Sequence, residues 1–129
     1  MILDATDLTT FEVAADGSRV RLNLLGADGR EFAVILPVAC ATALLMTLPA
    51  IQKQALQAIH NDPSMRVVYP MQGWKLEGSD EPGCVILTLA TADGFQVSFA
   101  LDSNSILDMA RALEDSQASL PVARTTLLQ

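Results

Sequence analysis

Few residues in this chain have the type and spacing that catalysis requires. The chain contains one histidine, His60, and a general base needs an orienting partner and a nucleophile within reach. His60 falls at the predicted end of a helix, where an imidazole interacts favourably with the helix dipole. The sequence contains no glycine-rich phosphate loop, GxSxG motif or HExxH motif. We therefore predict that the chain has no catalytic residue and is not an enzyme.

Two aspartates, Asp28 and Asp93, occupy equivalent places in the two halves of the chain, and each precedes a glycine. Paired carboxylates can perform acid–base chemistry when the fold brings them together. Asp-Gly is also the most favoured sequence of tight hairpin turns, and both copies follow alternating strand residues. We interpret both aspartates as turn residues. The acidic segment with Glu77, Asp80 and Glu81 lacks the ligand spacing of a calcium loop and is interpreted as a solvated turn.

Metal and cofactor binding are not expected. One histidine and two dispersed cysteines, Cys40 and Cys84, do not form a zinc-binding pattern. Because there is no CxxC pair, the cysteines are interpreted as reduced thiols that fill the core. The N-terminus carries early acidic residues and no basic segment, so we expect no secretory signal and a cytoplasmic location.

The residues best suited to binding are Tyr69, Met71 and Trp74. The chain has one tyrosine and one tryptophan, and both fall in this short segment. Large aromatic and adaptable side chains of this kind anchor protein interfaces. They are also ordinary strand residues that pack on a helix. The first half of the chain has Thr6 and Thr9 in the places of Met71 and Trp74, so we predict that the second half carries a binding site of its own.

The segments that are predicted to position these residues occur twice in the sequence. When the sequence is compared with itself at a shift of 65 positions, nine of the 37 positions from Glu12 to Leu48 are identical. The matches fall on alternating strand residues, a turn and a helix, and this pattern predicts a tandem duplication. The identical pairs are Glu12/Glu77, Val20/Val85, Leu22/Leu87, Leu24/Leu89, Ala27/Ala92, Asp28/Asp93, Gly29/Gly94, Leu36/Leu101 and Leu48/Leu113.

Each half is predicted to contain three strands followed by a helix. In the first half, residues 1–9 read as a lead-in, residues 10–15 and 19–25 read as strands, and residues 31–36 read as the central strand. Pro49 costs about 3 kcal/mol inside a straight helix, so we expect a kink or a break into two helices there. Asn61 is expected to cap this helix at its C-terminus. Either Asp102 or Ser105 is expected to cap the start of the second helix.

The predicted fold class is α+β. Residues 1–129 are expected to form a single domain with β-β-β-α units at approximately 10–64 and 65–116, related by a pseudo-two-fold axis, and a C-terminal tail at 117–129. Alternating strands indicate a sheet with one buried face. We expect one mostly antiparallel six-stranded sheet with both helices on one face. A half-open barrel or two facing three-stranded sheets would use the same segments.

Composition predicts exposed apolar surface. Half of the residues are apolar, only 18% are charged, and the mean hydropathy is +0.33. A chain of this size covers so much apolar surface most simply as a homodimer, with Leu44, Leu45 and Leu48 of the first predicted helix at the interface. The alternative is a monomer with a well-filled interior.

Two kinds of partner are excluded by charge. The net charge of −7 and the absence of a basic cluster disfavour nucleic acids and anionic membrane surfaces. Residues 32–51 lack charge over a length that could cross a bilayer. Prolines divide this segment, however, and its counterpart in the second half is charged, so we exclude a membrane span.

The function that these observations favour is a non-enzymatic protein-interaction module that forms a homodimer and binds an unknown protein partner. One alternative is a small-molecule-binding domain with an apolar pocket near Trp74. Another is a secretion chaperone, because the chain resembles the small acidic dimeric chaperones of bacterial secretion in size, charge and α+β composition. Those chaperones normally begin with a long amphipathic helix, which residues 1–18 do not supply.

Overall fold

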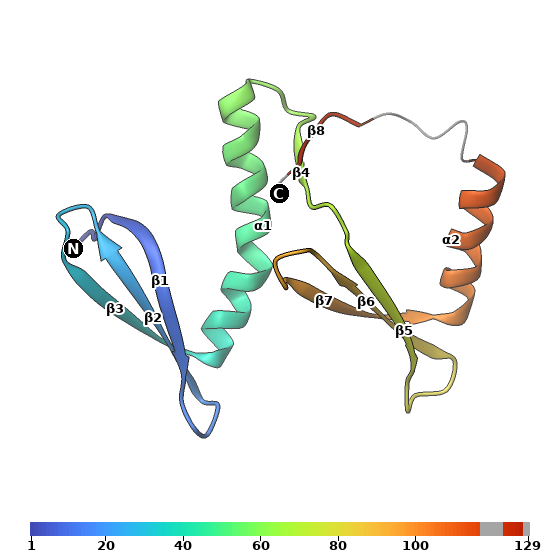
Figure 1. The fold of residues 1–129 in the computed structure, drawn as a ribbon, viewed down its shortest axis with the longest axis horizontal. Helices are drawn as coiled ribbons and strands as arrows, with labels where there is room; N and C mark the ends of the chain where they lie inside the picture. Colours follow the sequence, from blue (N-terminus) through green and yellow to red (C-terminus); the bar gives the residue numbers. More distant parts are fainter. Residues whose placement is uncertain (117–122, 128–129) are drawn as a thin grey trace. The chain divides into compact units, whose positions relative to one another are not determined.

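The computed structural model describes residues 1–116 and 123–127 of the chain. The fold is α+β, with two three-stranded antiparallel sheets and two helices (Figure 1). The chain divides into two compact units, unit 1 (Met1–Gln52) and unit 2 (Lys53–Gln129). Helix α1 (Val38–His60) runs from one unit into the other.

Unit 1 contains one sheet with the strand order β1-β2-β3. Gly29, in the turn between the second and third strands, has a φ of 82°, a conformation that glycine adopts easily because it lacks a Cβ. In the same turn Asp28 accepts a 3.0 Å hydrogen bond from the backbone N–H of Arg30, which confirms Asp28 as a turn residue. The strands are β1 (Ala5–Val13), β2 (Arg19–Gly26) and β3 (Glu31–Pro37).

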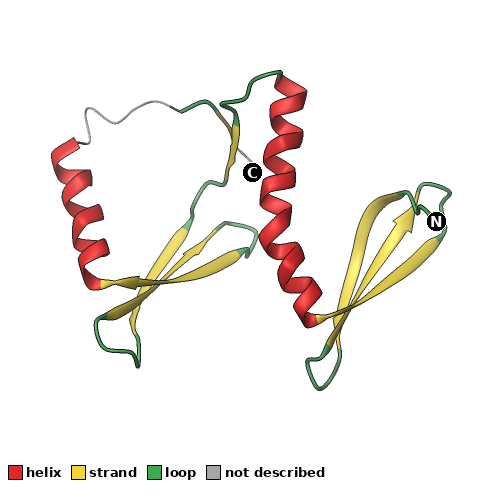
Figure 2. Cartoon of the chain, turned by 180° about the vertical axis from the view of Figure 1, so that it is seen from behind, coloured by secondary structure: helices red, strands yellow, loops and turns green. Residues whose placement is uncertain are grey.

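Unit 2 contains a second antiparallel sheet with the order β5-β6-β7 and a separate parallel pair formed by β4 and β8. In both units the last strand of the three-stranded sheet leads directly into a helix (Figure 2). The elements of unit 2 after α1 are β4 (Arg66–Val68), β5 (Gly73–Gly78), β6 (Cys84–Ala90), β7 (Gln96–Asp102), α2 (Ser103–Ser116) and β8 (Thr125–Leu127).

The two sheets pair their strands in the same register. Every residue pair between β2 and β3 recurs between β6 and β7 with 65 added to both residue numbers. The pairing of Phe11 with Leu22 likewise recurs as the pairing of Leu76 with Leu87. The shift that aligns the two halves of the sequence therefore also aligns their strand pairing.

Strand β1 departs from the shared register at two places, between Ala5 and Asp7 and between Leu8 and Thr10. Its pairing with β2 is irregular between Leu8 and Thr10, which marks a β-bulge. The bulge puts Leu8, in place of Thr9, on the same face as Phe11, although Leu8 and Phe11 are three positions apart. The bulge thus hides the alternation that would reveal a strand. For this reason the prediction of a lead-in through residue 9 is wrong, and β1 begins at Ala5.

The predicted six-stranded sheet is not confirmed, because the strands of the two units form separate sheets. The predicted cover of a sheet face by α1 is also absent, since no residue of α1 is buried. The connections explain this result. Strand β3 ends at Pro37 and α1 begins at Val38, and β7 ends at Asp102 and α2 begins at Ser103. A helix that turns back over its own sheet needs a loop, typically of about 2–6 residues, and neither unit has one.

The helix ends follow the sequence prediction in part. Helix α1 continues through Pro49, so a break into two helices is wrong. Asn61, directly after α1, has a φ of 48°, the left-handed conformation expected of its cap. Asp102 rather than Ser105 caps α2, because Asp102 Oδ1 accepts a 2.8 Å hydrogen bond from the N–H of Ser105. The central strands are β2 and β6, so the prediction that residues 31–36 form the central strand is wrong.

Part of the predicted C-terminal tail is a strand. Strand β8 pairs in parallel with β4, and Arg124 next to it forms a 2.6 Å ion pair with Asp62. The rest of the tail, residues 117–122 and 128–129, lies outside the described residues. Over the described part of the chain, neither helix has the combination of length and hydropathy that a bilayer crossing requires.

Candidate functional site

The apolar residues of unit 1 gather on one face of its sheet. The register places the valine and two leucines of β2 on this face, opposite further apolar residues of β1 and β3. None of these side chains is buried, and Phe11 on the edge strand β1 is 69% exposed. This surface, termed the unit 1 face, consists of Leu8, Phe11, Val13, Val20, Leu22, Leu24, Phe32, Val34 and Leu36.

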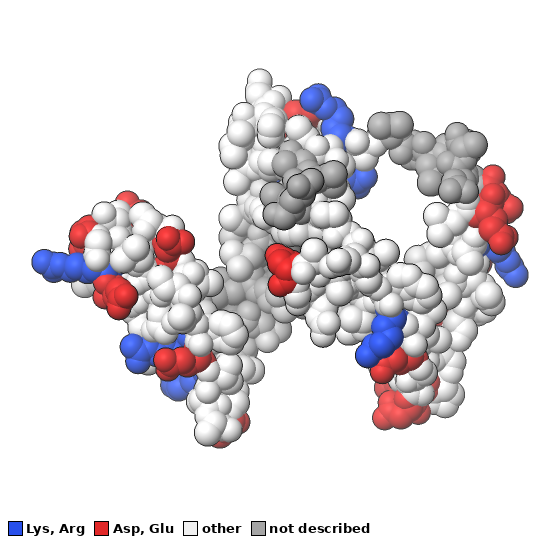
Figure 3. Space-filling view, in the orientation of Figure 1, with Lys and Arg blue, Asp and Glu red and all other residues white. Residues whose placement is uncertain are grey.

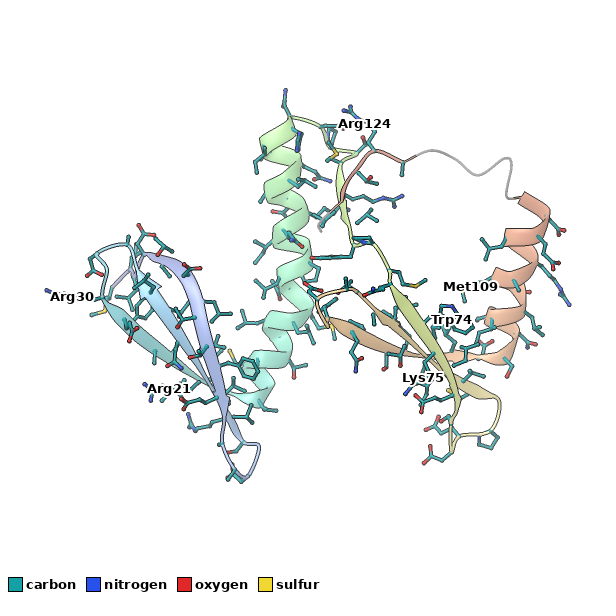
Figure 4. The ribbon with its side chains drawn as sticks, in the orientation of Figure 1. Arg21, Arg30, Trp74, Lys75, Met109 and Arg124 are labelled. Carbon is teal, nitrogen blue, oxygen red and sulfur yellow. The ribbon has the colours of Figure 1, made fainter. Side chains whose placement is uncertain are left out.

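The opposite face of the same sheet carries hydrogen-bonded polar side chains on β1 and β2, together with the apolar Leu25, Ala33 and Ile35. Arg21 Nε donates to Asn23 Oδ1, and Asn23 Nδ2 donates to the Thr10 hydroxyl, both at 2.9 Å. The Thr9 hydroxyl, freed from the apolar face by the bulge, donates to the carbonyl of Asn23 at 3.0 Å. Figure 4 marks Arg21 on this sheet. One face of the sheet is thus suited to water, and the other is suited to a partner.

Unit 2 has a corresponding surface, termed the unit 2 face. Trp74 on the edge strand β5 lies opposite Leu89 and is 63% exposed. Figure 4 shows Trp74 near Met109 of α2 in that view. The unit 2 face consists of Trp74, Leu76, Val85, Leu87, Leu89, Val97, Phe99 and Leu101.

The polar face of unit 2 differs in its contacts. The hydroxyls of Thr88 and Ser98 are hydrogen-bonded at 2.7 Å across β6 and β7, and Thr88 is buried. Lys75, labelled in Figure 4, forms a 3.3 Å ion pair with Glu77 on the same strand. Glu77 therefore belongs to β5, and the prediction that it lies in a solvated turn is wrong.

A hollow lies at one end of the unit 2 face. Its volume is about 220 Å³. The rings of Tyr69 and Phe95 lie 5.8 Å apart, tilted by 34°, at its wall. The lining is almost entirely carbon, so the hollow is suited to an apolar group. The lining residues are Tyr69, Met71, Leu89, Ala90, Thr91, Phe95, Val97 and Phe99.

The structure brings together two of the three predicted binding residues. Tyr69 and Met71 line the hollow, whereas Trp74 does not and lies farther along β5. Sequence analysis missed Phe95, Val97 and Phe99, which supply the other wall of the hollow. Phe95 directly precedes β7, and Val97 and Phe99 alternate on it. This alternation predicts one face of a strand, but it does not predict that the face lies beside Tyr69.

The three residues predicted at a dimer interface lie on α1. Leu44, Leu45 and Leu48 are all exposed. Helix α1 contains one charged residue, Lys53, along its length, and Figure 3 shows its visible surface as mostly uncharged. Helix α1 therefore offers a second apolar surface, at which Leu44, Leu45 and Leu48 are exposed.

Asp93 and His60 occupy the places in unit 2 that the sequence predicted. Asp93 accepts a short hydrogen bond from the Thr91 hydroxyl within the β6–β7 turn, which confirms its role as a turn residue and holds its pKa below the ordinary value. His60 ends α1, as predicted. Among the described residues, no group of histidine, cysteine, aspartate or glutamate side chains is placed to hold a metal ion. Cys40 is exposed on α1, so its prediction as a core residue is wrong.

One polar cluster ties the C-terminal strand to the end of α1. Asp62 Oδ1 accepts hydrogen bonds from the hydroxyl of Ser64 at 2.6 Å and from its N–H at 2.9 Å. Asp62 Oδ2 forms the 2.6 Å ion pair with Arg124, which Figure 4 labels. The Ser64 hydroxyl, the Ser64 N–H and the Arg124 charge lower the pKa of Asp62. This cluster stabilises the β4–β8 pair and leaves no carboxylate available for catalysis there.

Comparison with protein-family models, with curated proteins and with solved structures finds no match to this chain. The secretion chaperones that it resembles in composition begin with a helix, whereas this chain has the strand β1 as its first element. The argument for function therefore depends on the surfaces themselves.

Proposed function

We propose that the chain is a non-enzymatic interaction module that forms a homodimer through the unit 1 face. The observation that carries this proposal is a sheet face of nine apolar side chains, of which three are exposed, six are half-buried and none is buried. Exposed apolar patches on this scale mark interaction sites. The partner that we assign to the unit 1 face is the same face of a second copy, in a symmetric contact.

The accessibility of the unit 1 face supports a dimer. Leu8, Phe11 and Val13 on the edge strand β1 are exposed, and the six side chains that β2 and β3 contribute are half-buried. A second copy that covers the face removes more of this apolar surface from water.

Charge favours a contact between apolar faces. The chain carries a net charge of −7, so two copies repel each other wherever acidic surfaces meet. The unit 1 face contains no charged residue. A symmetric contact through this face keeps the charged residues at or beyond its rim.

We also propose that the two units are a tandem repeat and that the protein is cytoplasmic. The shared strand register supports the repeat, because register is set by the pattern of each strand and by its turns. The two free thiols, Cys40 and Cys84, support a reducing compartment.

The test of the dimer is light scattering on Phe11→Glu and on its matched control Ile35→Glu. Both changes put one acid in place of an exposed apolar residue, and Ile35 lies on the opposite face of the same sheet with 56% exposure. We expect the wild type and Ile35→Glu to be dimers. We expect Phe11→Glu to raise the dimer dissociation constant at least about tenfold while it keeps its circular dichroism.

If Phe11→Glu does not fold, Leu8→Glu replaces it, because Leu8 is also exposed on the edge strand β1. A monomeric wild type, or equal effects of the changes on the two faces, would refute the proposed interface.

A further inference from the structure

We infer that the hollow of unit 2 holds one aromatic side chain of a partner protein whose extended segment pairs with the edge of β7. This inference rests on the proposed function only in that the chain is an interaction module. It does not require the dimer, because it uses unit 2 alone.

The volume of the hollow favours a single amino acid side chain as its occupant over a free ligand or cofactor. Pockets for whole small molecules measure about 300–1,000 Å³, whereas a cavity of about 150 Å³ is enough to hold benzene. The hollow measures about 220 Å³. It therefore accommodates one aromatic ring with little room for the rest of a ligand, as a side chain attached to a polypeptide requires.

The lining is suited to an aromatic ring. Tyr69 and Phe95 are tilted relative to each other, and aromatic rings attract a further ring in offset or edge-to-face contacts. Met71 is unbranched and can adapt to the shape of its occupant. Residues of these types dominate the anchor positions of protein interfaces.

The strand that lines the hollow also has an open edge. Strand β7 pairs with β6 on one side and, in the part of the chain that the structure describes, with no strand on the other. Its pairing is regular, and its sequence contains no proline, lysine or arginine. Natural edge strands use such residues or bulges to prevent pairing, as β1 does with its two irregularities. Strand β7 lacks these protections, which suits it to accept an added strand.

Charge defines the ends of the partner segment. Asp93 lies in the turn before β7 and is hydrogen-bonded to Thr91, a residue of the hollow. Asp102 ends the same strand. A segment that spans β7 therefore meets a carboxylate at each end, so we assign it an aromatic anchor flanked by a lysine or arginine.

The experiment selects nine-residue peptides from a random phage-displayed library on the full chain and keeps those that bind Phe99→Asp at least about tenfold more weakly. The matched control is Ala100→Asp, the next residue of β7 on the opposite face of the sheet. We expect the selected peptides to share an aromatic residue, alternating apolar residues and a basic flank. We expect Ala100→Asp to bind them as the wild type does.

N-methylation of single peptide amides then tests the strand pairing. Edge pairing uses every second amide of the added strand, so binding should fall at alternate positions only. If Phe99→Asp is unfolded, Met71→Asp places the charge at the hollow from outside any strand. Loss of binding at every N-methylated position, or at none, would overturn the inference. A selection in which every bound peptide binds Phe99→Asp as tightly as the wild type, or in which the retained peptides also lose binding to Ala100→Asp, would overturn it too.

The outcomes separate this inference from the proposed dimer. A wild-type dimer that selects no Phe99-dependent peptide would remove the inference and leave the proposed function. A monomeric wild type that selects Phe99-dependent peptides would refute the proposed dimer and leave this inference in place.

Discussion

The two sheets have the same strand pairing and differ in what lies beside their apolar faces. In unit 2, Tyr69 and Met71 precede the first strand of the sheet and form a hollow with residues of β7. In unit 1 the first strand carries a bulge, and the places equivalent to Tyr69 and Met71 hold Asp4 and Thr6. The comparison indicates that one scaffold presents two different surfaces, an open apolar face in unit 1 and an anchor site in unit 2.

The largest expected change in the free energy of unfolding comes from truncating a leucine side chain on the central strand of each sheet. Leu22→Ala and Leu87→Ala remove equivalent side chains from β2 and β6. We expect each to lower the free energy of unfolding by about 2 kcal/mol. The proposed dimer covers the unit 1 face and not the unit 2 face. The stability difference between the wild type and Leu22→Ala should therefore grow with protein concentration, whereas the difference for Leu87→Ala should not. Urea unfolding at two protein concentrations measures both effects, and identical concentration dependence would contradict the comparison.

Substitutions on the polar faces of the two sheets should lower the free energy of unfolding by less. Thr88→Val removes the buried partner of the 2.7 Å hydrogen bond between Thr88 and Ser98, and we expect a loss of about 1–1.5 kcal/mol. Asn23→Ala breaks hydrogen bonds at an exposed place in the sheet of unit 1, and we expect at most about 1 kcal/mol, because water replaces the partners. Urea unfolding ranks the two variants. A larger effect for Asn23→Ala would contradict the ranking.

A smaller, local effect is expected at the C-terminal strand. Arg124→Ala removes the ion pair with Asp62. The amides of β4 and β8 should then exchange with deuterium faster, and the amides of β5, β6 and β7 should not change. Lys75→Ala, which breaks an exposed ion pair on β5, is the control and should leave β8 unchanged. Equal exchange of β8 in Arg124→Ala and wild type would show that the ion pair does not hold this strand.

The smallest effect is a difference in acid sensitivity. Hydrogen bonds from the side chains of Ser18, Ser64 and Thr91 hold the pKa values of Asp16, Asp62 and Asp93 below their ordinary value of 3.8. A pKa lowered by folding stabilises the folded state above the ordinary pKa, and this stabilisation is lost as the pH falls through the lowered value. Two of the three aspartates are in unit 2, so unit 2 should lose more stability below pH 3.8.

Amide exchange above and below that pH can follow the two units separately. Asp93→Asn should reduce the acid sensitivity of unit 2 without changing that of unit 1. A greater loss of stability in unit 1 than in unit 2 below that pH would contradict the prediction that Asp62 and Asp93 make unit 2 the more acid-sensitive.

Local patterns in the sequence predicted much of each unit. The alternation in β2, β3, β6 and β7, the Asp-Gly turns and the cap at Asn61 each depend on a few neighbouring residues, so they could be read directly. Strand β1 could not, because its bulge puts Leu8 and Phe11 on one face at a spacing that is not typical of a strand. The single six-stranded sheet was not confirmed, because adding strands from two units to one sheet depends on distant contacts that no local pattern encodes.

The sequence predicted only part of the candidate site, because local patterns do not show which distant segments meet. Tyr69 and Met71 stand out by residue type. The wall formed by Phe95, Val97 and Phe99 becomes visible only when register brings β7 beside the segment that precedes β5. Trp74, the most conspicuous residue of the sequence, does not line the hollow, although its partner across β5 and β6, Leu89, does.

The central claim is that a second copy covers the unit 1 face. An isotope-filtered NMR experiment on a mixture of labelled and unlabelled protein tests it directly. The proposed contact predicts intermolecular NOEs between the ring of Phe11 and the methyl groups of Leu22 or Val34. A dimer without these NOEs, or a protein that stays monomeric at the concentration of the experiment, would contradict it.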